Sequence, residues 1–71
     1  MNSVNVVTAY RYANRNSHTY IVGVFTFPED AIYSAELEED DRSGKYYCEV
    51  VQLDLNRHKT KKTIIRPLEE F

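Results

Sequence analysis

Three segments of this sequence alternate between two sets of side chains, and a segment of helical spacing lies between the second and the third. The alternating segments span residues 4–12, 18–25 and 45–55 and are rich in β-branched and aromatic residues, which favour strands. The polar residues 13–17 are typical of a hairpin loop, and residues 28–41 have the pattern of a helix. The sequence therefore predicts an α+β domain with the order strand, strand, helix, strand (ββαβ).

The start of the helix is marked by the stretch 26–29, Thr-Phe-Pro-Glu. This stretch has the spacing of a capping box, and proline is acceptable in a first helical turn because its missing N–H would be unpaired there. Farther along, Ala31, Ile32 and Ala35 share a narrow face of small side chains. We expect this face to lie close to a sheet.

Strict alternation in the second strand divides its residues between the two faces of the sheet. One face would carry Tyr20, Val22 and Val24, and the other would carry Ile21, Gly23 and Phe25. Gly23 also indicates a bulge or close packing by the helix.

A hairpin followed by a crossover helix constrains the topology of the sheet. A right-handed return places the third strand beside the first, so we expect an antiparallel sheet of order 2-1-3 with the helix on one face. Both faces of the strands carry apolar side chains, and one helix covers only one of them. The other face should be covered by a second subunit, as in a homodimer, or by a target protein.

We interpret residues 1–56 as the ββαβ domain and residues 57–71 as a basic C-terminal tail. The tail is expected either to pair as a short edge strand at residues 63–65, ending before Pro67, or to be disordered.

The chain is small, and its single cysteine rules out an internal disulfide. At 71 residues, a domain buries only about 60% of its unfolded surface, so stability should be marginal. Cys48 is expected to be a small apolar residue in a strand, which suits a reducing, cytoplasmic compartment. No run of 18 apolar residues and no signal-peptide pattern occurs, so the sequence predicts neither a membrane segment nor secretion.

Charged residues are segregated along the chain, although the net charge is only −2. Residues 29–41 hold seven of the eleven acidic residues, and residues 57–66 hold five of the nine basic ones. This polarity points to surfaces of opposite sign.

On a helical wheel, Glu29, Tyr33, Glu36 and Asp40 fall within a band about 60° wide, and Leu37 lies four residues after Tyr33. We predict that these five residues bind a partner protein, with Tyr33 and Leu37 as apolar anchors inside a carboxylate rim. A row of carboxylates can imitate phosphates, so a nucleic-acid-binding host protein would be a suitable target.

Three other interpretations of the same residues stay open. The acidic band could be a solvated helix face, Tyr33 and Leu37 could pack on the tail, and the basic tail could fold back on the helix to neutralise it.

A second hypothesis uses the strands and the tail to bind single-stranded nucleic acid through stacked aromatic rings. The residues concerned are Tyr10, Tyr12 and Tyr20, with Arg11 and Arg15. The sequence pI of about 5.6 opposes it, and direct binding to nucleic acid is not expected from the leading hypothesis.

Catalysis has little support in the sequence. His18 and His58 lie far apart and near no nucleophile with a base, and two histidines with one cysteine do not make a recognisable metal spacing. The two glycines do not form a phosphate-binding loop. We therefore expect neither an enzyme nor a cofactor or metal.

Several short stretches carry a resemblance to known proteins. They are Tyr10-Arg11-Tyr12, Ser17-His18-Thr19-Tyr20, Gly23-Val24-Phe25, Ala31, Ala35 and the run from Gly44 to Val50. Over residues 6–52 the chain resembles a group of small proteins common in phages and mobile elements. The resemblance implies an accessory protein that binds and disables a host protein in the bacterial cytoplasm, as anti-CRISPR proteins do.

Overall fold

The computed structural model describes residues 3–12 and 18–68, so the predicted hairpin loop at 13–17 lies outside the described residues. The elements in chain order are β1 (Ser3–Arg11), β2 (Tyr20–Phe25), α1 (Pro28–Asp41), β3 (Tyr46–Asp54) and β4 (Lys62–Arg66).

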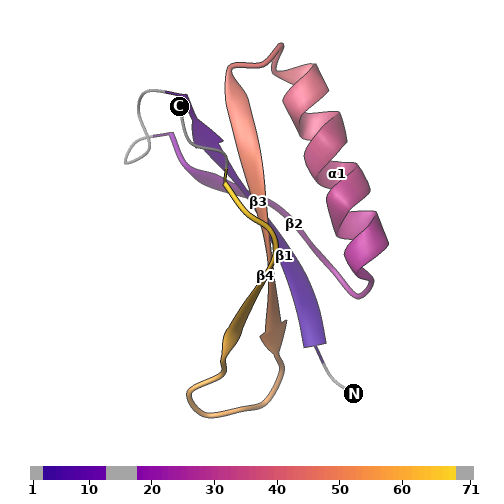
Figure 1. Ribbon diagram of the computed structural model, residues 1–71, viewed down its shortest axis with the longest axis vertical. Coiled ribbons are helices and arrows are strands. Elements are labelled where there is room, and N and C mark those ends of the chain that lie inside the picture. The colour runs from indigo at the N-terminus through magenta and orange to yellow at the C-terminus, as the bar shows by residue number, and fades with distance from the viewer. Residues whose placement is uncertain (1–2, 13–17, 69–71) are drawn as a thin grey trace.

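The strands form one antiparallel sheet in the order β2-β1-β3-β4, and α1 lies along one face of it (Figure 1). The predicted α+β class and the 2-1-3 order are confirmed. A fourth strand, β4, lies within the segment predicted as a basic tail and pairs with β3 at the edge of the sheet. The β3–β4 connection projects from the end of the sheet opposite the α1–β3 connection (Figure 1).

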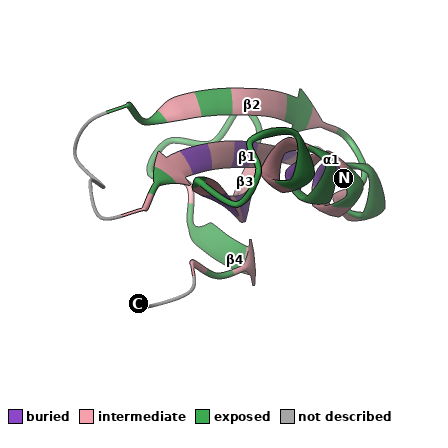
Figure 2. Ribbon diagram, turned by 90° about the horizontal axis from the view of Figure 1, so that it is seen from above, coloured by how far each residue is buried: buried purple, intermediate pink, exposed green. Residues whose placement is uncertain are grey.

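The core between α1 and the sheet is built from small side chains. Its buried members are Val7, Ala9, Ala31, Ala35, Cys48 and Val50. The alanines let the helix approach the sheet closely, as their shared face predicted. Figure 2 shows buried segments in β1, β3 and α1, whereas β2 and β4 are half-buried or exposed. No leucine, isoleucine or phenylalanine among the described residues is fully buried.

The predicted faces of β2 are wrong, because a bulge shifts the alternation. Val7 lies opposite Gly23 and Thr8 lies opposite Ile21, which leaves Val22 as the extra residue on β2. Tyr20, Val22 and Phe25 therefore pack against the core, while Ile21 and Val24 are exposed on the other face. The bulge that Gly23 indicated is confirmed. A Cβ at Gly23 would lie 2.8 Å from Cε1 of Phe25, so a larger residue would displace that ring.

The predicted capping box is also wrong. The helix begins at Pro28 as expected, but its N-cap is Phe27, which forms no side-chain cap hydrogen bond. Thr26 lies one residue too early to cap, and its carbonyl oxygen accepts a hydrogen bond from Asn5 Nδ2 (3.1 Å). Asn5 of β1 therefore holds the β2–α1 connection in place through this hydrogen bond.

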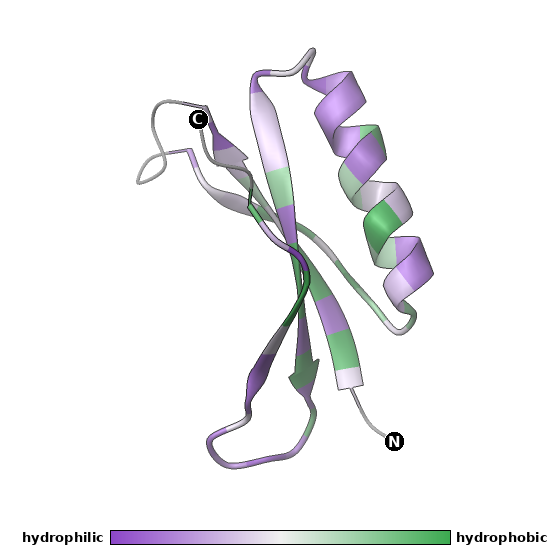
Figure 3. Ribbon diagram, in the orientation of Figure 1, coloured by the Kyte–Doolittle hydropathy of each residue, from purple (hydrophilic) through white to green (hydrophobic). Residues whose placement is uncertain are grey.

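The face of the sheet away from α1 carries a second group of aliphatic side chains. The register places Val4 and Val6 of β1 on this face with Val51 and Leu53 of β3. α1 is mainly hydrophilic, while β1 and β3 carry hydrophobic segments (Figure 3). None of the helices described is long and apolar enough to cross a membrane.

Candidate functional site

The outer face of α1 gathers the five residues predicted to bind a partner. Tyr33 and Leu37 are 63% and 51% exposed, one helical turn apart, and neither is covered by the described part of the tail. Glu29, Glu36 and Asp40 are exposed beside them. We call these five residues the outer stripe.

The carboxylates of the outer stripe have no direct ion-pair partner among the described residues, although Glu36 interacts electrostatically with Arg66. Among the described residues, none of Glu29, Glu36 and Asp40 forms an ion pair with a basic side chain. No basic residue occupies the last turn of α1 either, although a cation there would suit the helix dipole. The outer stripe therefore presents negative charge around two apolar side chains.

The acids on the inner side of α1 have a different role. Glu38 accepts hydrogen bonds from the hydroxyl of Tyr20 and from Nε of Arg42, the latter at 3.1 Å. These two donors lower the pKa of Glu38 below its ordinary value. Burial, followed by the hydrogen bond to Glu38, raises the pKa of Tyr20. The Arg42 guanidinium also lies over the rings of Tyr20 and Tyr46, at 5.7 and 5.9 Å from their centroids.

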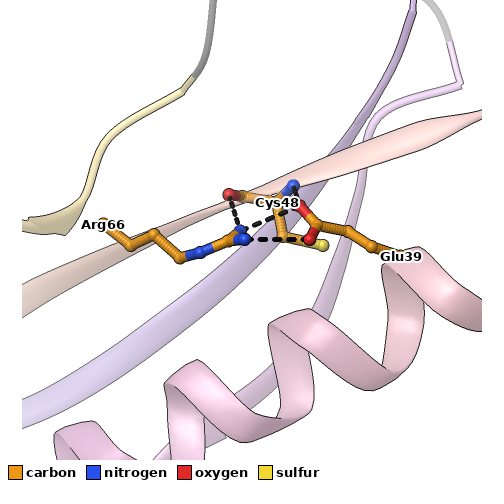
Figure 4. A network of polar contacts seen from close by, with 3 residues as sticks. All are labelled: Glu39, Cys48 and Arg66. Atoms are coloured by element: carbon orange, nitrogen blue, oxygen red, sulfur yellow. Dashed lines mark hydrogen bonds and ion pairs between the residues drawn. The ribbon is translucent and has the colours of Figure 1, made fainter. Parts of the chain in front are cut away.

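Glu39 fastens α1 to β3 and β4 (Figure 4). Its two carboxylate oxygens accept hydrogen bonds from Nη1 and Nη2 of Arg66, at 2.8 and 2.9 Å, and Oε2 also accepts one from the backbone N–H of Cys48 at 2.9 Å. Nη1 of Arg66 donates to the carbonyl oxygen of Cys48 as well (2.9 Å). Burial raises the pKa of Glu39, but the donors from Arg66 and Cys48 outweigh it and hold the pKa below its ordinary value.

This network shows which acidic residue of α1 the tail neutralises. Arg66 is the tail residue that forms an ion pair with α1, and it binds Glu39 on the inner side rather than the outer stripe. Sequence reasoning did not single out Glu38 or Glu39. A signal was present for Glu39, since it continues the i, i+4 row of Ala31 and Ala35 that faces the sheet.

A hollow of about 310 Å³ adjoins the C-terminal end of the outer stripe. It is lined by Tyr12, Glu39, Asp40, Ser43, Gly44, Tyr46, Tyr47 and Arg66. Glu39 is already bound to Arg66, so Asp40 is the carboxylate in this hollow that forms no ion pair with a described residue. Tyrosine rings beside a carboxylate can accommodate a basic side chain of a partner.

The residues of the nucleic-acid hypothesis are divided between the two faces of the sheet. Tyr20 packs on the helix side of the sheet, against Tyr46, with ring centroids 5.6 Å apart. On the opposite face, Tyr10 and Tyr12 both pack on Tyr47, with ring centroids 6.3 and 4.7 Å apart. The basic residues of the β3–β4 hairpin begin beyond Leu53, roughly 20 Å along β3 from Tyr47. Arg15 lies outside the described residues.

Cys48 is the single cysteine of the chain. Cys48 is buried, and this burial raises the pKa of its thiol to about 11. The thiol is therefore protonated at neutral pH and is a poor nucleophile. Within residues 3–12 and 18–68, no group of three or more His, Cys, Asp or Glu side chains could hold a metal ion.

No protein family, curated protein or solved structure matches this chain. No other part of the described fold explains why the outer stripe is exposed and charged.

Proposed function

We propose that this protein binds a partner protein through the outer stripe and inhibits it stoichiometrically. The observation that carries the proposal is the exposure of Tyr33 and Leu37 among carboxylates that pair with no described basic residue. Exposed aromatic and aliphatic anchors surrounded by a charged rim are typical of the energetic centre of an interface.

The division of acids on α1 supports this role. Glu38 and Glu39 hold the helix in place, so the outer acids are not needed for that task. Carboxylates that the fold does not use add repulsion within the helix, and binding a basic surface would relieve it. A complementary partner has an apolar pocket surrounded by basic residues. Proteins that bind nucleic acid carry basic surfaces of this kind.

The resemblance to phage and mobile-element proteins supports a biological setting for this binding. In that setting the partner is a bacterial defence or host protein, such as a CRISPR effector, and the inhibitor acts in the cytoplasm. The small size of the chain and the high pKa of Cys48 fit an inhibitor that occupies a surface better than one that modifies its target.

A capture experiment with charge-reversed variants tests the proposal. Immobilised wild-type protein and a Glu36→Lys, Asp40→Lys variant are incubated with bacterial lysate, and bound proteins are quantified by mass spectrometry. We expect the partner enriched by the wild type to be reduced at least about tenfold with this variant, because like charges would oppose a basic rim.

The matched control is an Asp30→Lys, Asp41→Lys variant. It changes the net charge of the chain by the same amount, at exposed positions roughly 100° around the helix from the mean direction of Glu29, Glu36 and Asp40. We expect it to retain the partner. Equal losses with both variants would show that net charge alone decides binding, and equal retention would exclude the outer stripe; either result contradicts the proposal.

The alternative function is nucleic-acid binding. The basic residues available for it lie in the β3–β4 hairpin. Arg57, Lys59, Lys61 and Lys62 are exposed there, and only Arg57 forms an ion pair with a described residue, Asp54 at 3.5 Å. A gel shift with single-stranded DNA at several salt concentrations separates the two functions. Binding that weakens steeply with salt and is lost in a Lys59→Glu, Lys61→Glu variant would favour the alternative.

A further inference from the structure

The sheet face opposite α1, which we call the open face, is aliphatic on all four strands. Its exposed members are Ile21, Val24 and Ile64, at 64%, 57% and 51% exposure. Between them in the register of the sheet lie Val4, Val6 and Leu53, which are half-buried, and Val51, which is 7% exposed. A continuous aliphatic surface of this kind is unusual on a monomer in water and marks an interface.

The core is also small in the part of the chain that the structure describes. There the largest fully buried side chains are Val7, Val50, Asn5 and Cys48, and every leucine and isoleucine keeps contact with solvent. Domains of this size without a disulfide or metal are commonly stabilised by association. Burying the open face would supply the missing apolar contacts.

The charges on the open face indicate what covers it. Glu49 and Lys62 lie on this face on either side of Val51, because Glu49 pairs with Thr8 and Lys62 pairs with Leu53. They are separated by four residues of β3, about 13 Å. Glu49 accepts a hydrogen bond from the hydroxyl of Tyr10 (3.4 Å), and neither charged residue forms an ion pair with a described residue. The open face thus carries one charge of each sign at opposite ends of an aliphatic band, and a second copy turned end for end matches it.

We propose that the open face is the interface of a symmetric homodimer. In this dimer the two sheets pack face to face, with a two-fold axis that runs across the strands near Val51. Ile64 then meets its own copy, and Glu49 of each subunit lies beside the partner's Lys62. The helices remain on the outside, so the dimer presents two outer stripes on opposite sides. This inference does not depend on the proposed function.

Two lysine substitutions of equal exposure test the interface. Ile64→Lys places a charge on the open face, and Leu37→Lys places one on α1; the two native side chains are each 51% exposed. By sedimentation velocity over a range of concentrations, we expect the wild type and Leu37→Lys to dimerise, and Ile64→Lys to weaken dimerisation at least about tenfold. Circular dichroism confirms that each variant is folded.

Charge exchange tests the orientation of the subunits. Glu49→Lys and Lys62→Glu should each weaken the dimer, because each places two like charges together, whereas the double variant should restore it to within about threefold of the wild type. A wild-type monomer at all concentrations would overturn the homodimer and assign the open face to another protein. A dimer unaffected by Ile64→Lys, or a double variant no better than the single ones, would also overturn the proposal.

Discussion

At the scale of single residues, Asn5 joins three segments of the fold. Its side chain is fully buried, and Nδ2 donates to the carbonyl oxygens of Phe25 (3.3 Å) and Thr26 (3.1 Å). Its Oδ1 accepts a hydrogen bond from Nε2 of Gln52 (3.3 Å). Asn5 thereby links β1 to β3, to the end of β2 and to the segment before α1, where the helix has no side-chain cap.

Replacing Asn5 with leucine should therefore destabilise the protein. Leucine has the same branched shape and number of side-chain heavy atoms, but it is bulkier, and the substitution removes both N–H donors and leaves buried polar groups unpaired. We expect the free energy of unfolding to fall by about 1–3 kcal/mol in urea denaturation. Thr63→Val, at an exposed position of β4, should change it by less than about 0.5 kcal/mol. Equal effects of the two substitutions would contradict this role for Asn5.

Alternation in β1 places Asn5 on the same face as Val7 and Ala9, so its burial could be predicted from the sequence. Its partners could not, because they lie 20, 21 and 47 residues away. The capping role predicted for Thr26 failed because of where the helix begins. The capping-box spacing was present, but the helix begins one residue too late for Thr26 to use it.

At the scale of elements, α1 has two chemically distinct sides. Glu38 and Glu39 bind donors from β2, β3, β4 and the end of the helix, while the outer stripe pairs with no described basic residue. The inner acids fix the orientation of α1, and this orientation determines which acids remain outside. The helix bounds and the alanine face could be predicted from local spacing, whereas the ion pair with Arg66 spans 27 residues and required the sheet topology.

The lowered pKa values of Glu38 and Glu39 predict a loss of stability in acid. A carboxyl group whose pKa is lower in the folded state stabilises that state above its unfolded pKa, and this contribution disappears as the pH falls through the folded value. Stability should therefore decline as the pH falls below about 5, past the ordinary value of 4.5. Urea denaturation between pH 7 and pH 3 measures this decline.

A Glu39→Gln variant separates the ion pair from other acid effects. At pH 7 we expect it to lower the free energy of unfolding by about 1–3 kcal/mol, since it removes charge-assisted hydrogen bonds from Arg66. Its stability should then depend less on pH than that of the wild type. Glu36→Gln removes an exposed carboxylate of the same helix and should keep the wild-type pH profile. An unchanged profile in Glu39→Gln would contradict the role of this pair.

At the scale of the whole molecule, two surfaces of different character lie on opposite sides of the fold. The outer stripe of α1 is acidic with two apolar anchors, and the open face of the sheet is aliphatic with one charge of each sign. The existence of an uncovered sheet face could be predicted, because one helix cannot cover two faces. The exposure of Ile21 and Val24 on it could not, since it depends on the bulge at Val22.

The most direct test of the central claim is a side-chain footprint of the partner complex. Hydroxyl radicals label exposed Tyr33, Leu37 and Leu55 in the free protein, and mass spectrometry measures the labelling of each after the captured partner is added. We predict that labelling of Tyr33 and Leu37 falls several-fold on binding, while labelling of Leu55 does not change. Protection of Leu55 without protection of Tyr33 and Leu37 would contradict the claim that this protein binds through the outer stripe.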